Sequence, residues 1–219
     1  MKFYNTKFSN KTSFHQCENI FWDFDGVIKD SVEVKSNAFF KLFEKFGHDL
    51  ALKVMSHHED NGGLSRFEKI PIYLDLAGKE PTEKLINDYC IKFSKLVKQE
   101  VIESKWVPGV LDFIIKNNKK SSYFLVTATP QDEIEEIMNE LNIMPYFVEV
   151  IGSPTKKTKA IEKILKQYSI SPNNSIMIGD SYGDLKAANF NCVPFILRRT
   201  KINKNLQKEL NCPKIYNFM

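Results

Sequence analysis

The feature that most constrains this chain is an apolar segment that ends in two closely spaced carboxylates, Phe21-Trp22-Asp23-Phe24-Asp25-Gly26. Side chains alternate between the two faces of a strand, so Asp23 and Asp25 point to the same side while Phe24 packs behind them. Two carboxylates held together repel each other. Both stay ionised only when a cation lies between them; otherwise one takes up a proton. Hard oxygen ligands of this kind suit Mg²⁺, so the segment predicts a site at the end of a buried strand.

Size and composition narrow the class of protein. The chain has 219 residues, of which 42% are hydrophobic and 26% charged, with a formal net charge of +4. That length suffices for one α/β core plus a smaller insert. The small net charge, with both signs interspersed, argues against nucleic acid as a partner. No apolar run approaches the length that spans a bilayer, and the start of the chain has no apolar signal segment. We therefore expect a cytoplasmic protein.

The four cysteines, Cys17, Cys90, Cys192 and Cys212, lie far apart and have neither zinc-knuckle nor redox spacing. We expect them to be reduced and mostly buried.

Helical patterns fill the segment after the acidic strand. Apolar residues recur at helical spacing over 32–47 and over 81–100. Between these two patterns, Ser65 and Glu68 have the spacing of a capping box that opens another helix. No strand signal interrupts them, so we expect residues 32–104 to be all helical.

Two features inside this segment have structural interpretations. A polar stretch that contains His57 and His58 reads as a loop, and neither histidine has an acid or cysteine partner at metal-ligand spacing. The phenylalanines at helical spacing are expected to form the core of the insert. They are Phe39, Phe40, Phe43 and Phe46.

From residue 105 onward, strand and helix patterns alternate. The expected strands are 123–126, 147–151, 175–180 and 193–197, and the expected helices are 110–118, 157–168 and 182–190. This alternation implies a parallel, doubly wound sheet with helices on both faces. Ligands of such sheets bind outside the carboxyl ends of the strands. Polar groups stand at three strand ends, which are Asp23 with Asp25, Thr127, and Asp180. We expect them to meet at one edge of the sheet, with Thr129 capping the following helix.

These motifs, in this order, resemble those of the haloacid dehalogenase superfamily, and specifically its phosphatases with a helical cap inserted after the first strand, similar to the phosphoglycolate phosphatase and β-phosphoglucomutase branch. The matching residues are Asp23, Asp25 and Gly26; Thr127; a lysine among Lys156, Lys157 and Lys159; and Gly179, Asp180 and Asp184. The resemblance implies an α/β fold, a Rossmann-like doubly wound core with an inserted all-α cap. On this basis we expect the core to comprise residues 1–31 and 105–219, and the cap residues 32–104.

The resemblance also implies the role of each site residue. Asp23 attacks phosphorus and Asp25 acts as the general acid and base. Thr127 and the backbone N–H of Ala128 hold the phosphate, and a lysine neutralises its charge. Mg²⁺ is bound by Asp23, Asp25 (through its backbone carbonyl) and Asp180, with Asp184 as a further ligand or an orienting group.

The spacing does not decide which lysine neutralises the charge of the phosphate. Lys157 fits best, Lys156 is second and Lys159 third. Two cations of the cap segment are candidates for substrate binding. Lys35 lies on the first cap helix, at a position near which related sugar-phosphate mutases carry a histidine, and Arg66 follows a glycine-containing turn.

The resemblance implies a Mg²⁺-dependent phosphoric monoester hydrolase that acts on a small phosphorylated metabolite, a sugar phosphate or a phosphoglycolate-like acid. The alternatives are a phosphomutase acting on a sugar phosphate and a non-catalytic regulator that binds a phosphorylated ligand. Asp25 argues against a dehalogenase, and Lys35 leaves phosphonate hydrolysis as a remote alternative. We expect no nucleic-acid or membrane partner and a monomer or homodimer. For the basic tail from residue 201, the sequence leaves open whether it packs on the sheet edge.

Overall fold

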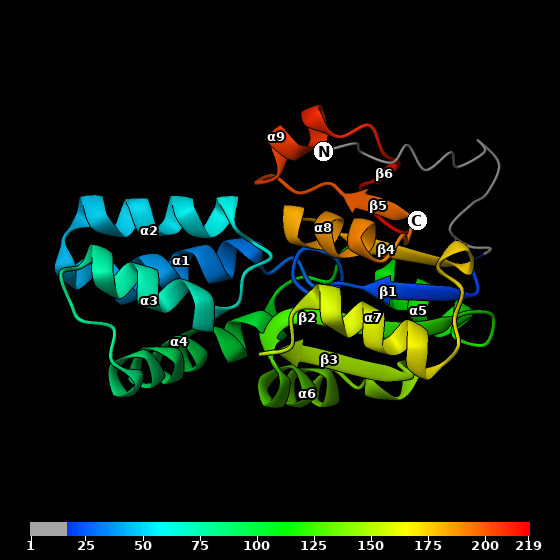
Figure 1. The fold of residues 1–219 in the computed structure, drawn as a ribbon, viewed down its shortest axis with the longest axis horizontal. Coiled ribbons are helices and arrows are strands. Elements are labelled where there is room, and N and C mark those ends of the chain that lie inside the picture. Colours follow the sequence, from blue (N-terminus) through cyan, green and yellow to red (C-terminus); the bar gives the residue numbers. More distant parts are fainter. Residues whose placement is uncertain (1–16) are drawn as a thin grey trace.

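The structure, a computed structural model, describes residues 17–219 and contains the predicted parallel sheet (Figure 1). Six strands lie in the order β3-β2-β1-β4-β5-β6, and all five neighbouring pairs are parallel. Their bounds are β1 Asn19–Trp22, β2 Ser122–Pro130, β3 Glu149–Ser153, β4 Ser175–Gly179, β5 Phe195–Arg198 and β6 Lys214–Ile215. The doubly wound α/β fold predicted from the sequence is therefore confirmed. The prediction about a signal segment concerns residues 1–16, outside the described range.

Helices cover both faces of the sheet because each central strand is apolar on both sides. Ile20 and Trp22 of β1 pack in one buried cluster with α5 and α6, while Phe21, from the opposite face, packs in another with α7 and α8. The bounds are α5 Val110–Asn117, α6 Gln131–Glu140, α7 Lys157–Gln167 and α8 Tyr182–Phe190. This double burial fixes β1 at the centre, so the acids that follow it stand at the middle of the sheet edge.

Four helices lie between β1 and α5 and stand apart from the sheet layers (Figure 1). They are α1 Val32–Phe43, α2 His48–Asp60, α3 Arg66–Leu76 and α4 Glu83–Glu103. We call them the helical insert. The insert is all helical, as expected, and Ser65 with Glu68 forms the predicted capping box. The division into two domains at residues 31 and 104 stays a prediction.

The loop predicted around His57 and His58 is wrong. Both residues lie in the last turns of α2, where the apolar side chains Ala51 and Val54 are buried one to two turns earlier. The polar composition of this stretch misled the interpretation, because the helix is stabilised by packing of its apolar side on α1 rather than by its own propensity. His58 is itself buried, with 6% of its surface exposed.

Two chain segments connect the insert to the sheet, and they are bonded to each other. The N–H of Asp30 donates to the carbonyl of Lys105 and that of Val107 to the carbonyl of Ile28, at 2.8 and 3.0 Å. Lys29, in the first of these segments, has 2% of its surface exposed. Its ammonium donates to the carbonyl oxygen of Ile102 at 2.8 Å and lies 4.5 Å from the ring centroid of Trp106.

The tail from residue 201 packs on the sheet edge, which answers the question that the sequence left open. After α9 (Lys204–Glu209), β6 pairs with β5, and Phe218 is buried with its ring centroid 5.3 Å from that of Trp22. The expectation of mostly buried cysteines is only partly met. Cys90 is buried, Cys17 and Cys212 are half-buried, and Cys192 is exposed, all four as free thiols. Within residues 17–219, no helix has the length and apolar character needed to cross a bilayer.

Candidate active site

Three carboxylates meet where β1 and β4 end side by side. Asp23, Asp180 and Asp184 each offer an oxygen, and these oxygens all lie within 4.8 Å of one another. Their exposed fractions are 5, 9 and 0%. The N–H of Asp23 donates to the carbonyl of Ile178 at 3.0 Å, which continues the β1–β4 ladder to this point. The sheet register itself therefore brings the first and last predicted motifs together.

The close approach of the backbone to this cluster requires glycine at Gly26. Its φ is +75°, and a Cβ atom there would lie 2.3 Å from Asp180 Oδ2. Both the backbone conformation and the space exclude a larger residue. Gly26 of the acidic motif thus lets the turn after β1 pack directly against the acid of β4.

Burial and mutual repulsion raise the pKa of two of these acids, Asp23 and Asp180. Burial and the Asp184 carboxylate raise the pKa of Asp23 to about 7, and burial and the Asp23 carboxylate raise the pKa of Asp180 well above its ordinary range. A divalent cation at the cluster would reverse both effects, because it favours the ionised forms. Three carboxylate oxygens in this arrangement fit a hard divalent cation. Asp25 is not part of this cluster, so its predicted contribution to metal binding through the backbone stays a prediction.

Lys157, at the start of α7, is the lysine that reaches the cluster. Its Nζ lies 2.7 Å from Asp23 Oδ1 and 2.6 Å from Asp184 Oδ1, with 6% of its side chain exposed. Burial alone would lower the pKa of Lys157, but the carboxylates of Asp184 and Asp23 outweigh burial and raise it. Lys156 and Lys159 have side chains 74 and 66% exposed and pair with Glu68 and Glu162 on the surface. The spacing argument ranked Lys157 first, and its role as the catalytic lysine stays a prediction.

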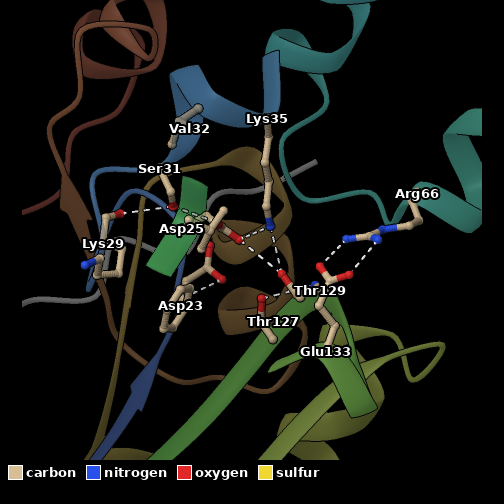
Figure 2. A network of polar contacts seen from close by, with 12 residues as sticks. Asp23, Asp25, Lys29, Ser31, Val32, Lys35, Arg66, Thr127, Thr129 and Glu133 are labelled. Atoms are coloured by element: carbon tan, nitrogen blue, oxygen red, sulfur yellow. Dashed lines mark hydrogen bonds and ion pairs between the residues drawn. The ribbon is translucent and has the colours of Figure 1, made fainter. Parts of the chain in front are cut away.

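Asp25 lies beside the cluster in its own network of donors (Figure 2). Ser31 Oγ donates to Asp25 Oδ1 at 2.7 Å. The Lys35 ammonium and the Thr129 hydroxyl both donate to Asp25 Oδ2, and Lys35 also donates to Thr129 Oγ1 at 2.8 Å. Burial alone would raise the pKa of Asp25. The charge of Lys35 and the hydrogen bonds from Lys35, Ser31 and Thr129 outweigh burial and lower it. The predicted cap role of Thr129 is therefore wrong: Pro130 occupies the N-cap of α6, and the Thr129 hydroxyl faces Asp25 instead.

Thr127 completes the set from β2. It is 1% exposed, and its Oγ1 accepts the backbone N–H of Thr129 at 3.2 Å. With Ala128, it lines a cavity of about 140 Å³ between the sheet edge and the insert. Asp23, Asp25, Asp180 and Lys157 line the same cavity. Asp184 does not line it and contacts it through Lys157 and Ser181, and the exposed Lys156 and Lys159 lie outside it. Lys35 and Arg66 enter it from the insert.

Arg66 is paired rather than free. Its Nη1 and Nη2 donate to Glu133 Oε2 and Oε1 at 2.8 and 2.5 Å, and Ser94 also donates to Glu133. Figure 2 shows this pair beside the Asp25 network. Its predicted role in substrate binding stays a prediction. Glu133 was missed from the sequence because an acid in the first turn of a helix is fully explained by the helix dipole.

Comparisons with known proteins identify the family of the chain. A family model described as "Haloacid dehalogenase-like hydrolase" matches residues 20–197. "Phosphorylated carbohydrates phosphatase" of Thermotoga maritima is 25% identical over 181 residues, which span 78% of this chain and 80% of that protein. "Phosphoglycolate phosphatase 1" of Pseudomonas aeruginosa is 25% identical over 180 residues, spanning 77% of this chain and 64% of that protein.

Solved structures share the fold. β-Phosphoglucomutase from Clostridium difficile superposes with a TM-score of 0.73 at 21% identity, covering 92% of each chain. CbbY from Rhodobacter sphaeroides, in complex with phosphate, has a TM-score of 0.73 at 16% identity, covering 92% of this chain and 95% of that one.

Proposed function

Because the chain belongs to the haloacid dehalogenase-like hydrolases, we propose that it is a phosphatase that hydrolyses a small phosphorylated metabolite through an aspartyl-phosphate on Asp23. The observation that carries this proposal is the location of Asp23. It is the buried carboxylate at the end of the central strand, contacted by Lys157 and lining the cavity between the sheet edge and the insert. A phosphoryl group in that cavity would meet an in-line nucleophile and fixed positive charge, which are what phosphoryl transfer requires.

The two aspartates of the acidic motif have separate tasks. An Asp23 oxygen forms a bond to phosphorus while the bond from phosphorus to the leaving oxygen breaks, and Asp25 gives that oxygen its proton. Asp25 then takes a proton from the water that attacks the aspartyl-phosphate, and this releases inorganic phosphate and restores Asp23. Ser31, Thr129 and Lys35 hold the Asp25 carboxyl in place. Because Lys35 favours the ionised form of Asp25, donation of a proton to the leaving oxygen requires the Lys35 ammonium to leave Asp25 Oδ2 when the substrate is bound.

Lys157 and Thr127 would stabilise the negative charge of the transferred phosphoryl group. The ammonium of Lys157 lies between Asp23 and Asp184 and would neutralise a phosphoryl oxygen beside the nucleophile. Thr127 Oγ1 and the N–H of Ala128 would hold the other oxygens. We infer that Mg²⁺, bound by Asp23, Asp180 and Asp184, supplies the remaining charge neutralisation when present.

The size of the cavity supports a small substrate. The cavity of about 140 Å³ is below the volume of most ligand pockets, and a neighbouring pocket of about 300 Å³ shares Thr127, Ala128 and Lys157 with it, so the space beside Asp23 is of the size that a small metabolite needs. Relatives named for phosphorylated carbohydrates and for phosphoglycolate support the same class. We therefore propose a short phosphorylated acid or a sugar phosphate as the substrate.

The test is phosphate release with Mg²⁺ from a panel of phosphorylated metabolites, using the wild type, Asp23→Asn and, as a control, Asp75→Asn, which changes an exposed aspartate of α3. We expect the wild type and the control to release phosphate at equal rates and Asp23→Asn to show only background. Acid quenching during turnover should trap a phosphorylated wild type and leave Asp23→Asn unmodified. Phosphate release by Asp23→Asn would refute the mechanism. Isomerisation of a sugar phosphate without net release would identify a mutase instead.

A further inference from the structure

One buried cation of the insert has no place in the reaction described above. Lys69, in α3, is 1% exposed and lines the same cavity as Asp23 and Asp25. The single hydrogen bond found for its ammonium in residues 17–219 is to Nδ1 of His58, at 2.8 Å. An ammonium has three donors, so two N–H groups of Lys69 are left without a partner in this part of the chain.

The charge of Lys69 also lacks a counter-charge. No carboxylate of the described residues forms an ion pair with it, although Glu59 and Asp60 line the same cavity. The other two insert cations at the cavity are already matched, Lys35 by Asp25 and Arg66 by Glu133. A buried ammonium without an acid is destabilising. Among the residues that the structure describes, Lys69 is therefore a cation of the cavity wall that has no carboxylate partner.

His58 positions this ammonium without neutralising it. Burial and the neighbouring Lys69 hold the pKa of His58 well below its ordinary range, so its ring is neutral. The ring packs on Phe39, with centroids 4.8 Å apart, which fixes Nδ1 toward Lys69. The result is an oriented cationic donor beside the ring of Phe39 in the cavity wall.

We propose that Lys69, positioned by His58, binds a second anionic group on the substrate, a carboxylate or a second phosphate carried by the leaving group. The assignment rests on the proposed phosphatase function, because it places the phosphoryl group at Asp23 and the leaving group against the insert. The second anion supplies the missing counter-charge and accepts hydrogen bonds from the two remaining N–H groups of the Lys69 ammonium. The substrate class is then a phosphate monoester with a further negative charge, rather than a neutral sugar or alcohol phosphate.

The test compares esters that share a carbon frame and differ in charge. The two-carbon set is 2-phosphoglycolate, 2-hydroxyethyl phosphate and phosphoethanolamine. Glucose 1,6-bisphosphate with glucose 6-phosphate forms a second pair, which separates a phosphate from a carboxylate as the recognised anion. We expect the wild type to favour the more anionic member of at least one set by about tenfold or more in kcat/KM, since a hydrogen bond to a charged group contributes at least that much.

The variants are Lys69→Met and, as a matched control, Lys84→Met, which removes an exposed lysine of α4. Lys69→Met should lower kcat/KM for the favoured anion by about 10- to 100-fold and bring the selectivity ratio close to one. Lys84→Met should keep the wild-type ratio. An unselective wild type, or an unchanged ratio in Lys69→Met, would overturn the proposal.

Two further arms separate this outcome from failure of the proposed function. If the wild type hydrolyses no ester, the phosphatase proposal fails, and calorimetric binding of the same compounds to Asp23→Asn with and without Lys69→Met still tests the anion site. Lys69→Gln guards against a packing defect specific to methionine. Because both changes remove a buried unpaired charge, both should fold and melt no earlier than the wild type. Unfolding of both would assign Lys69 to the structure of the insert and refute the proposal.

Discussion

Arg66 of α3 and Glu133 of α6 form a two-point ion pair that joins the helical insert to the sheet layers beside Asp25. The two N–O distances are 2.8 and 2.5 Å, and each residue is 6% exposed. Parallel hydrogen bonds between a guanidinium and a carboxylate fix orientation as well as distance. The pair therefore stabilises one arrangement of the insert over the cavity, the arrangement in which Lys35 reaches Asp25.

Breaking this pair should be costly from either side. Arg66→Met leaves the Glu133 carboxylate buried and unpaired, so the free energy of unfolding should fall by about 3–5 kcal/mol. In the double variant Arg66→Met/Glu133→Met, no charge is left behind, and the loss should be smaller than the sum of the two single losses. Urea unfolding of all four proteins measures the coupling. The exposed pair Lys98–Glu136 joins α4 to the same α6. Its removal should shift the midpoint far less, and an equal shift would contradict the role of burial.

Lys157 should matter for both stability and activity. Lys157→Met leaves Asp23, Asp180 and Asp184 without a protein cation, so we expect a loss of about 3–5 kcal/mol in urea unfolding, together with loss of phosphate release. Added Mg²⁺ should restore part of the stability and none of the turnover. Lys159→Met, which removes an exposed lysine two residues along α7, should leave both quantities unchanged. Full activity in Lys157→Met would exclude Lys157 from the chemistry.

Two adjacent glycines of the insert should respond differently to alanine. A Cβ on Gly63 would lie 2.4 Å from the Cα of Gly183 in the sheet layers, whereas a Cβ on Gly62 meets nothing nearer than 3.4 Å. Gly63→Ala should therefore prevent the insert from seating beside Asp180 and lower kcat/KM by about tenfold or more, because small misplacements at such sites have large effects. Gly62→Ala should stay near wild type. Equal effects of the two changes would show that the backbone contact is not needed for activity.

Divalent metal should stabilise the folded protein through the three-carboxylate cluster. At Mg²⁺ concentrations about 100 times the dissociation constant, the gain in unfolding free energy is about 2.7 kcal/mol, and a chelator should reverse it. Asp180→Asn removes one ligand and part of the repulsion, so it should melt later than the wild type without metal and gain less on adding it. Thermal denaturation with and without Mg²⁺ measures both effects. A Mg²⁺ response that survives unchanged in Asp180→Asn would place the metal elsewhere.

Lys69 should leave a pH signature in stability. Burial, followed by the charges of Lys35 and Lys157, lowers the pKa of Lys69 from 10.5 to about 7. The carboxylates of Asp25 and Glu68 act in the opposite direction, and the neutral ring of His58 contacts the amine. Between these pH values the unfolded chain binds the proton and the folded protein does not, so the penalty is full below about pH 7 and disappears toward pH 10.5. The stability gained in Lys69→Met should thus be largest at or below pH 7 and shrink as the pH rises. A gain that is independent of pH would refute this cause.

Local sequence patterns predicted much of the fold and many residues of the candidate site. The acidic motif after an apolar run located β1, and the predicted helix 182–190 coincides with α8. Lys157 could be ranked above its neighbours because it stands at the predicted start of α7, where it fits the spacing of the family motif best. These features depend on residues within one element, which is the range over which periodicity is informative.

The missed features depend on contacts between elements. Thr129 was given to a helix cap because its position fits one, yet its hydroxyl bonds to Asp25, 104 residues away. Lys69 and His58 meet across two helices of the insert, and nothing in either local sequence distinguishes them from surface residues. Partnership between distant side chains is set by tertiary packing, which a single sequence does not display.

The bonded connections around Lys29 have a mechanical consequence. Two independent tethers would let the insert twist and slide over the sheet. Here the tethers are hydrogen-bonded to each other, and buried Lys29 of the first tether contacts Ile102 and Trp106 at the second. Because the tethers are bonded to each other, we expect them to move together as one hinge and the insert to swing as a unit. Small rotations at Lys29 would then become large displacements at the far ends of its helices.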